Sequence, residues 1–244
     1  MTIMGGQGTT GMLGLLQLAD SCFPAGGFAF SNGLEGLAKS GWLRGIEDFR
    51  QYLECYLGQV ASADLPFLNS AFPLAAPEGS GADAGPSRPG DAFAEVAWEW
   101  DAFLSLPSPR RASLSQGQAW LRAMEGAHAH PAVDALRPWF KDRSIPAHFL
   151  MAFAASLRIL GFSLAEAQSL LLHMALRDQL GAAVRLGLVG SLQAQGLHSR
   201  FLSVTEALRV RHGSSTHHGS MKTAPMIEMG QAGHPYLYSK LFQS

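Results

Sequence analysis

The sequence has few charged residues, and this scarcity excludes several classes of partner. Asp, Glu, Lys and Arg make up 15% of the 244 residues and leave a net charge of -1, whereas an average soluble domain contains about 25% charged residues. A chain without a basic excess has no field that would hold nucleic acid or an anionic membrane. A surface so poor in charge also predicts that other proteins cover part of it.

Long apolar runs and cysteines are scarce as well. No uninterrupted apolar run reaches the ~18 residues of a membrane span, and the first residues lack the basic and apolar regions of a secretory leader. Cys22 and Cys55 are the only cysteines, which is too few for a disulfide framework and is typical of a reducing compartment. We therefore expect a cytoplasmic protein that contacts no membrane.

Motifs for catalysis and cofactor binding are missing too. A phosphate-binding loop needs a lysine directly after a glycine, and none of the four lysines has one before it. The sequence contains no Gly-x-Ser-x-Gly, His-Glu-x-x-His or Cys-x-x-Cys pattern. Nine histidines invite a metal interpretation, above all His212, His217 and His218, but the sequence offers no fixed third ligand. We expect no enzyme, no catalytic residue, no cofactor and no specific metal site.

A glycine-rich loop between two short helices organises the first part of the chain. Residues 15–42 read LLQLADSCFPAGGFAFSNGLEGLAKSGW. Pro24 removes a backbone donor, and Gly26 and Gly27 permit a tight turn with positive φ.

The helix after this loop has one apolar face. Ser31 or Asn32 can cap its N-terminus. Glu35 lies off the apolar stripe, so we expect its side chain to be exposed. The residues of that stripe recur at helical spacing: Leu34, Leu37 and Ala38.

Helical periodicity recurs along most of the chain and predicts an all-α fold, a single-domain helical bundle over residues 12–212. Asp64 is suited to cap the helix that Leu65 begins. Ser163 and Glu166 form a capping box that opens a helix running to about Val189. Ser191 can cap a last long helix that runs to about His212.

Three stretches break this periodicity. Residues 73–91 are rich in Pro, Gly, Ala and Ser, and we interpret them as a flexible, disordered insertion. Residues 127–146 resemble a weakly structured connector. Residues 213–233 are polar and predicted to be mobile, so residues 213–244 form a mobile C-terminal tail.

Two features allow both a structural and a functional interpretation. The run RASLSQG, which ends at Gly117, is either a polar face where two helices approach closely or a contact surface for another protein. Asp178 and Arg185 lie two turns apart on an otherwise apolar helix, and buried charges need partners. They are either paired within the bundle or a dimer interface, or part of a functional contact face.

The chain ends in GHPYLYSKLFQS, which combines aromatic, aliphatic and cationic side chains. Two tyrosines, a leucine and a phenylalanine are costly to leave in water, and their burial would contribute several kcal/mol at ~25 cal/mol per Å2. The tail is therefore expected to dock on a neighbouring protein or back on this one.

Three parts of the sequence resemble the UreF family of urease accessory proteins. The first is Pro24-x-Gly-Gly-Phe followed by Ser-x-Gly-Leu-Glu and Gly-Trp, the second is the apolar block over residues 148–195, and the third is the tail from His234 to Ser244. Pro235 and Lys240 stand where many members have Glu and Arg. Several residues near the end look closer to plant and algal members: Ala224, Pro225, Gln231, Tyr236 and Leu237.

The resemblance implies a homodimeric, non-enzymatic adaptor that assists nickel insertion into urease. Such a protein would bind the accessory protein UreD, also called UreH, and the GTPase UreG, and would modulate GTP hydrolysis while the complex holds the urease apoprotein. The resemblance and the apolar side chains of the tail together predict these partner-binding residues: Gly26, Gly27, Phe28, Ser31, Glu35, Arg185, His234, Tyr238, Ser239, Lys240, Leu241 and Phe242.

A second hypothesis belongs to another class. The Leu, Met and Ala residues around His173 would also suit an α-helical enzyme or carrier that holds an apolar ligand or a metal among its helices. A single buried histidine more often bonds to a carbonyl than to a ligand, which favours the adaptor.

Overall fold

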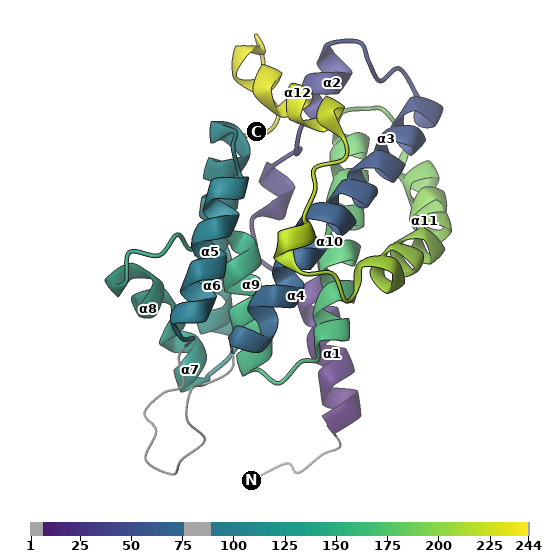
Figure 1. Ribbon diagram of the computed structural model, residues 1–244. Coiled ribbons are helices and arrows are strands. Elements are labelled where there is room, and N and C mark those ends of the chain that lie inside the picture. The colour runs from purple at the N-terminus through teal and green to yellow at the C-terminus, as the bar shows by residue number, and fades with distance from the viewer. Residues whose placement is uncertain (1–6, 76–88, 244) are drawn as a thin grey trace, which may run out of the picture.

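The computed structural model describes residues 7–75 and 89–243, and over these ranges it contains helices and no strands (Figure 1). The all-α prediction is confirmed. The α-helices are α1 (Gln7–Ala19), α2 (Leu34–Lys39), α3 (Ile46–Gln59), α4 (Leu65–Leu74), α5 (Asp91–Phe103), α6 (Pro107–Ala127), α7 (Pro131–Asp134), α8 (Leu136–Asp142), α9 (Phe149–Ile159), α10 (Leu164–Arg185), α11 (Ser191–His212) and α12 (Pro225–Gly233). Single turns complete the chain: η1 (Gly27–Ala29), η2 (Val60–Asp64), η3 (His217–Gly219) and η4 (His234–Tyr236).

Two helices form the centre of the molecule. Helix α9 is almost entirely buried and packs against α6 and α4, while α10 packs against α1, α3 and α11 (Figure 1). The core is contiguous, and large aromatic side chains fill it, with Phe49, Tyr52, Phe93, Trp120 and Phe153 all less than 2% exposed. Burial of whole aromatic rings is a main source of stability in such a bundle.

The capping prediction at α10 is confirmed. Ser163 Oγ accepts a hydrogen bond from the Glu166 amide at 3.2 Å, and Glu166 Oε2 accepts one from the Ser163 amide at 2.7 Å. The helix ends at Arg185 rather than near Val189, because Gly187 adopts a left-handed φ of 73° that stops the helix. The next helix, α11, ends at His212 as expected, but Ser191 is its first residue and Gly190 occupies the N-cap position instead.

Helices α6 and α9 approach each other at a glycine. A Cβ atom on Gly117 would lie 1.9 Å from the carbonyl oxygen of Ala147, immediately before α9. Only glycine permits such a contact between backbones. The close-approach interpretation of the RASLSQG run therefore holds, and its role as a contact surface stays a prediction.

The connector is more structured than its sequence indicates. Helices α7 and α8 lie within residues 127–146, and Leu136, Trp139 and Phe140 are buried there. Most of the expected insertion at residues 73–91 lies outside the described residues, and α4 and α5 flank it.

Asp64 does not cap a new helix. The chain continues from α3 into α4 through η2, a single π-helical turn, and the Asp64 side chain makes no capping hydrogen bond. A π turn inserts an extra residue and is a frequent feature of functional sites.

The segment after α11 differs from the mobile stretch that its sequence indicates. The Asn69 side-chain amide donates to the carbonyl oxygens of His212 and Ser215 at 3.0 and 2.9 Å. The Met221 amide donates to the carbonyl of Ser62 at 3.0 Å. These bonds to α4 and η2 hold the segment, and α12 then packs against α2 (Figure 1).

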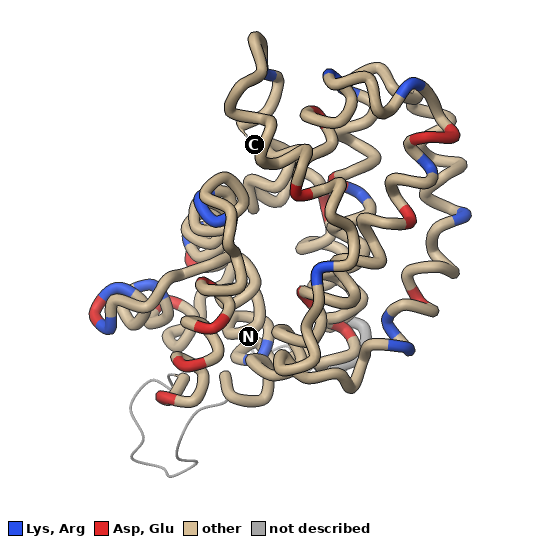
Figure 2. Tube along the Cα trace, turned by 45° about the horizontal axis from the view of Figure 1, so that its top comes forward, with Lys and Arg blue, Asp and Glu red and all other residues tan. Residues whose placement is uncertain are grey.

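Charged residues are scattered over the trace with long uncharged intervals between them (Figure 2). None of the described helices combines the length and the apolar character needed to cross a membrane.

Candidate functional site

Glu35 on α2 lies at the centre of the predicted partner-binding residues, and its side chain is fully buried. Its carboxylate accepts hydrogen bonds from the amides of Leu241 and Phe242 at 2.7 and 3.2 Å. It also contacts Nε2 of His234 at 2.9 Å. The expectation that Glu35 is exposed is therefore wrong, because the C-terminal tail returns and covers the face of α2 that its own apolar stripe leaves open.

A cation completes the surroundings of this carboxylate. Lys39 Nζ lies 3.0 Å from Glu35 Oε1 and also donates to Oγ of Ser239 at 3.2 Å. Burial alone would raise the pKa of Glu35, but the bonds from the Leu241 amide, Lys39, His234 and the Phe242 amide lower it below its ordinary value. The stabilisation is thus present above the ordinary carboxyl pKa and is lost only as the pH falls through the lowered value.

The tail ends in an aromatic anchor beside the glycine-rich loop. Phe242 is buried, and the guanidinium of Arg185 lies 4.2 Å from its ring centroid. Arg185 also donates to the carbonyl oxygen of Phe28, and the Gln243 amide donates to that of Ala29 at 2.9 Å. A cation over an aromatic ring adds about 0.5–2 kcal/mol, so α10, the loop and the tail hold one another.

The packing of α12 on α2 sets the position of the tail. A Cβ atom on Gly36 would lie 2.2 Å from the carbonyl oxygen of Gly230, and one on Gly230 would lie 2.4 Å from that of Gly33. The two backbones therefore touch, and α12 delivers His234 to Glu35.

The loop residues occupy the other side of this site. Gly26 adopts a left-handed φ of 75°, and a Cβ on Gly27 would lie 2.4 Å from Oδ2 of Asp178. Ser31 is buried, and its Oγ accepts a hydrogen bond from the Glu35 amide at 3.3 Å. Gly33 rather than Ser31 or Asn32 occupies the N-cap position of α2, and Ser31 bonds this first-turn amide from two residues before the cap.

The predicted residues thus gather in one place but differ in accessibility. Phe28, Tyr238 and Leu241 are exposed, whereas Ser31, Glu35, His234 and Phe242 are buried. Lys240 turns back to the carbonyl oxygen of Pro235 at 2.9 Å. Four exposed side chains of the loop and the tail are defined here as the tail–loop patch: Phe28, Tyr236, Tyr238 and Leu241.

Charges on α10 are paired within the chain. Oδ1 of Asp178 lies 2.7 Å from Nη2 of Arg177. The Nη1 atom of the same arginine donates to the carbonyl oxygen of Ala19. Burial raises the pKa of Asp178 against the opposing effect of Arg177. Arg185 faces the tail instead of forming an ion pair with Asp178, so the structural interpretation applies to Asp178 and the contact-face interpretation of Arg185 stays open.

A cavity of about 170 Å3, lined by both apolar and polar side chains, lies beside the loop and η2. Asn32, Tyr56, Asp64, Asp178 and Lys222 are among its lining residues. Burial raises the pKa of Asp64 to about 7, with Lys222 opposing the shift. Sequence reasoning placed Asp64 at a helix end and missed this cavity, because neither the π turn nor the distant lysine leaves a local signal.

Asp64→Asn is expected to stabilise the protein at pH 8 but not at pH 4. In the native state the Asp64 carboxyl keeps its proton up to pH ~7, whereas in the unfolded chain it loses the proton near pH 3.8. Wild-type stability therefore falls as the pH rises between these values, by at most about 4 kcal/mol and on the order of 2 kcal/mol where cavity water screens the charge. Urea unfolding at both pH values measures the difference, and an equal change at both would contradict it.

The cavity gives little support to the apolar carrier hypothesis. Its lining includes apolar side chains such as Trp100 and Phe149, but its volume is below the ~300 Å3 at which ligand pockets typically begin. His173 instead meets His198 of α11 with ring centroids 5.4 Å apart, and burial lowers its pKa, with His198 and Arg177 adding to the shift.

Comparison with known proteins identified a matching family model and several similar sequences. The family model UreF matches residues 43–202. The chain is 29% identical to urease accessory protein F of Arabidopsis thaliana over 230 residues, which is 93% of this chain and 90% of the relative. It is 29% identical to the rice protein of that name (Oryza sativa subsp. indica), covering 93% and 82% of the two chains. The urease accessory protein UreF of Trichodesmium erythraeum is 27% identical over 94% of this chain and 95% of its own length.

Proposed function

We propose that this chain, which belongs to the UreF family, is a non-enzymatic cytoplasmic adaptor in the assembly of the urease nickel centre. It bridges the accessory protein UreD (UreH) and the GTPase UreG and modulates GTP hydrolysis while the complex holds the urease apoprotein. We further propose that the adaptor works as a homodimer.

The observation that carries this proposal is the way Glu35 holds the tail. The buried carboxylate fixes Leu241 and Phe242, and Phe242 is the anchor. The exposed side chains of the tail–loop patch then stand on a fixed backbone. Preorganisation of aromatic side chains lowers the entropy cost of binding, and exposed aromatic residues on a charge-poor surface are typical of protein interfaces.

We propose different roles for the predicted partner-binding residues. Phe28, Tyr238 and Leu241 contact the partner, whereas Glu35, His234 and Phe242 position them. Gly26 and Gly27 shape the loop, and Arg185 connects the loop to the tail. The patch is the proposed UreD surface, since it combines the tail with the loop.

Deletion of residues 234–244 is expected to abolish co-purification with the UreD partner. The deletion removes Tyr238, Leu241 and the Phe242 anchor, while the core helices keep their packing. Helix content by circular dichroism should stay within a few per cent of the wild-type value, because only η4 and the extended tail are lost. Pull-down from cells that express both proteins is the measurement.

A double variant, Tyr238→Ser with Leu241→Ser, separates contact from tail docking. Both side chains are exposed, so the tail should remain docked while binding weakens at least tenfold. Full co-purification of either the deletion or the double variant would contradict the proposed role of the patch.

A further inference from the structure

We propose that Glu99, His217 and His218 form a binding site for one divalent transition-metal ion. The ion would join the segment that follows α11 to helix α5. These residues lie outside the tail–loop patch, and the proposal does not depend on partner binding.

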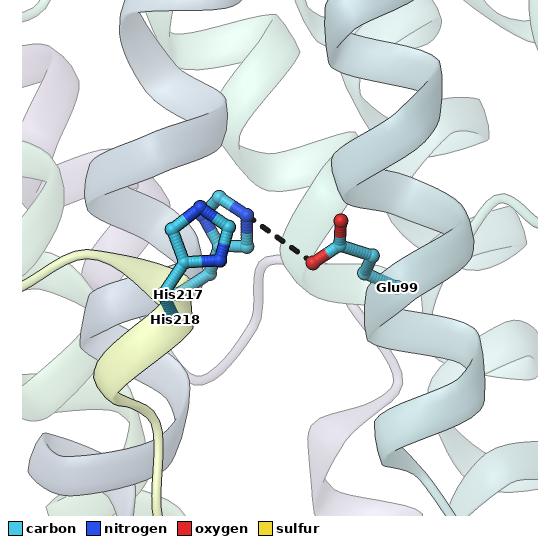
Figure 3. Close-up of side chains that lie close together, drawn as sticks. All are labelled: Glu99, His217 and His218. Carbon is cyan, nitrogen blue, oxygen red and sulfur yellow. Dashed lines mark ion pairs between the residues drawn. The ribbon is translucent and has the colours of Figure 1, made fainter.

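The three side chains already point toward one another (Figure 3). One ligand atom from each lies within 4.8 Å of those of the other two, and His217 Nε2 lies 3.2 Å from Glu99 Oε2. Ligands bound at 2.0–2.2 Å in a tetrahedral site are about 3.4 Å apart. Movement of the exposed Glu99 and His218 side chains by about 1 Å would thus complete the geometry.

A buried nitrogen at this cluster lacks a partner. His217 Nδ1 is buried and has no hydrogen-bond partner among the described residues. The rings of His217 and His218 lie close together, with centroids 4.0 Å apart and planes tilted by 40°. Buried imidazole nitrogens are normally bonded. Because Nε2 is the nitrogen that faces Glu99, it is the metal-binding nitrogen of His217 in this proposal, and Nδ1 stays outside the coordination sphere.

The backbone on both sides of the cluster is fixed before an ion binds. The His217 amide donates to Ser70 Oγ of α4 at 3.1 Å, and the His217 ring lies 5.6 Å from that of Phe67. Phe67 in turn packs edge-on against Trp100, the neighbour of Glu99 on α5. Ligands that the fold holds in place lose little entropy on binding.

The donor set selects the class of ion. Two imidazoles and one carboxylate suit Zn²⁺, Ni²⁺ or Co²⁺, whereas Mg²⁺ and Ca²⁺ prefer sites made of oxygen ligands. Because Glu99 and His218 are exposed, water can fill the remaining coordination positions, as in open His₂Glu sites.

Calorimetric titration of the full chain with Zn²⁺ and with Ni²⁺ tests the site. We expect one ion per chain for at least one of the two metals. Glu99→Gln and His218→Ala should each weaken binding tenfold or more, since the loss of a residue that only hydrogen-bonds a metal ligand already costs 10–100-fold. Both side chains are exposed, so both variants should fold. Bound metal should also raise the melting temperature of the wild type and not that of His218→Ala.

His198→Ala is the matched control, because His198 and His173 form another histidine pair away from this cluster. It should bind the ion as tightly as the wild type. Absence of stoichiometric binding of either metal, or an affinity that neither Glu99→Gln nor His218→Ala changes, would overturn the proposal.

Discussion

Glu35→Ala should release the C-terminal tail and lower urease activation at least tenfold, although the core stays folded. The substitution leaves Lys39, His234 and the amides of Leu241 and Phe242 without their shared acceptor. A buried donor without a partner costs about 1–3 kcal/mol, so the loss of several bonds together exceeds the ~1.5–3 kcal/mol that burial of one phenylalanine side chain contributes. Limited proteolysis should cut the variant between residues 234 and 243, where the wild type resists.

Glu54→Ala is the control for this experiment. Glu54 is an exposed glutamate on α3 whose partner is Arg50, so its loss should change neither proteolysis nor urease activation. If Glu35→Ala keeps a protected tail and full activation, then Glu35 does not position the tail. Released tail with normal activation would instead show that the docked conformation is unnecessary for function.

Gly117→Ala should lower the free energy of unfolding by about 3 kcal/mol or more. The added methyl group would lie 1.9 Å from the Ala147 carbonyl oxygen, and a backbone atom cannot rotate away as a side chain can. Helices α6 and α9 would have to separate in the middle of the core, and overpacking of this kind costs 1–3 kcal/mol or more. Urea unfolding followed by circular dichroism measures the loss.

Gly126→Ala provides the comparison within the same helix. A Cβ there meets no atom within 4 Å, so the gain in helix propensity should stabilise the chain by up to about 1 kcal/mol. Equal stability of Gly117→Ala and Gly126→Ala would show that α6 and α9 can separate without loss.

Local signals in the sequence account for the parts of the fold that could be predicted. The Ser163–Glu166 capping box and the end of α11 depend on neighbouring residues, and such patterns can be read directly. The three motifs that resemble the family were also contiguous. Their residues converge on one site because α2, α10 and the tail meet there.

Contacts between distant segments account for the errors. Periodicity placed Glu35 outside the apolar stripe of α2, but it contains no information about a tail that returns from residue 234 onward. The proximity of Glu99 to His217 could not be read from the sequence for the same reason, because α5 reaches His217 only through the packing of α4. The burial of Trp139 and Phe140 was not predicted, because the prolines around them suggested a weakly structured connector. Pro131 in fact begins α7.

The backbone contact between α2 and α12 fixes where the C-terminal tail begins. Gly230 is locked against Gly33 and Gly36, and His234 follows it by four residues, about one helical turn. Insertion or loss of one residue between them would rotate the imidazole by about 100° and point it away from Glu35. The glycine contact therefore fixes the distance from α2 to His234. Residues 231–233 should tolerate changes of residue type far better than changes of length.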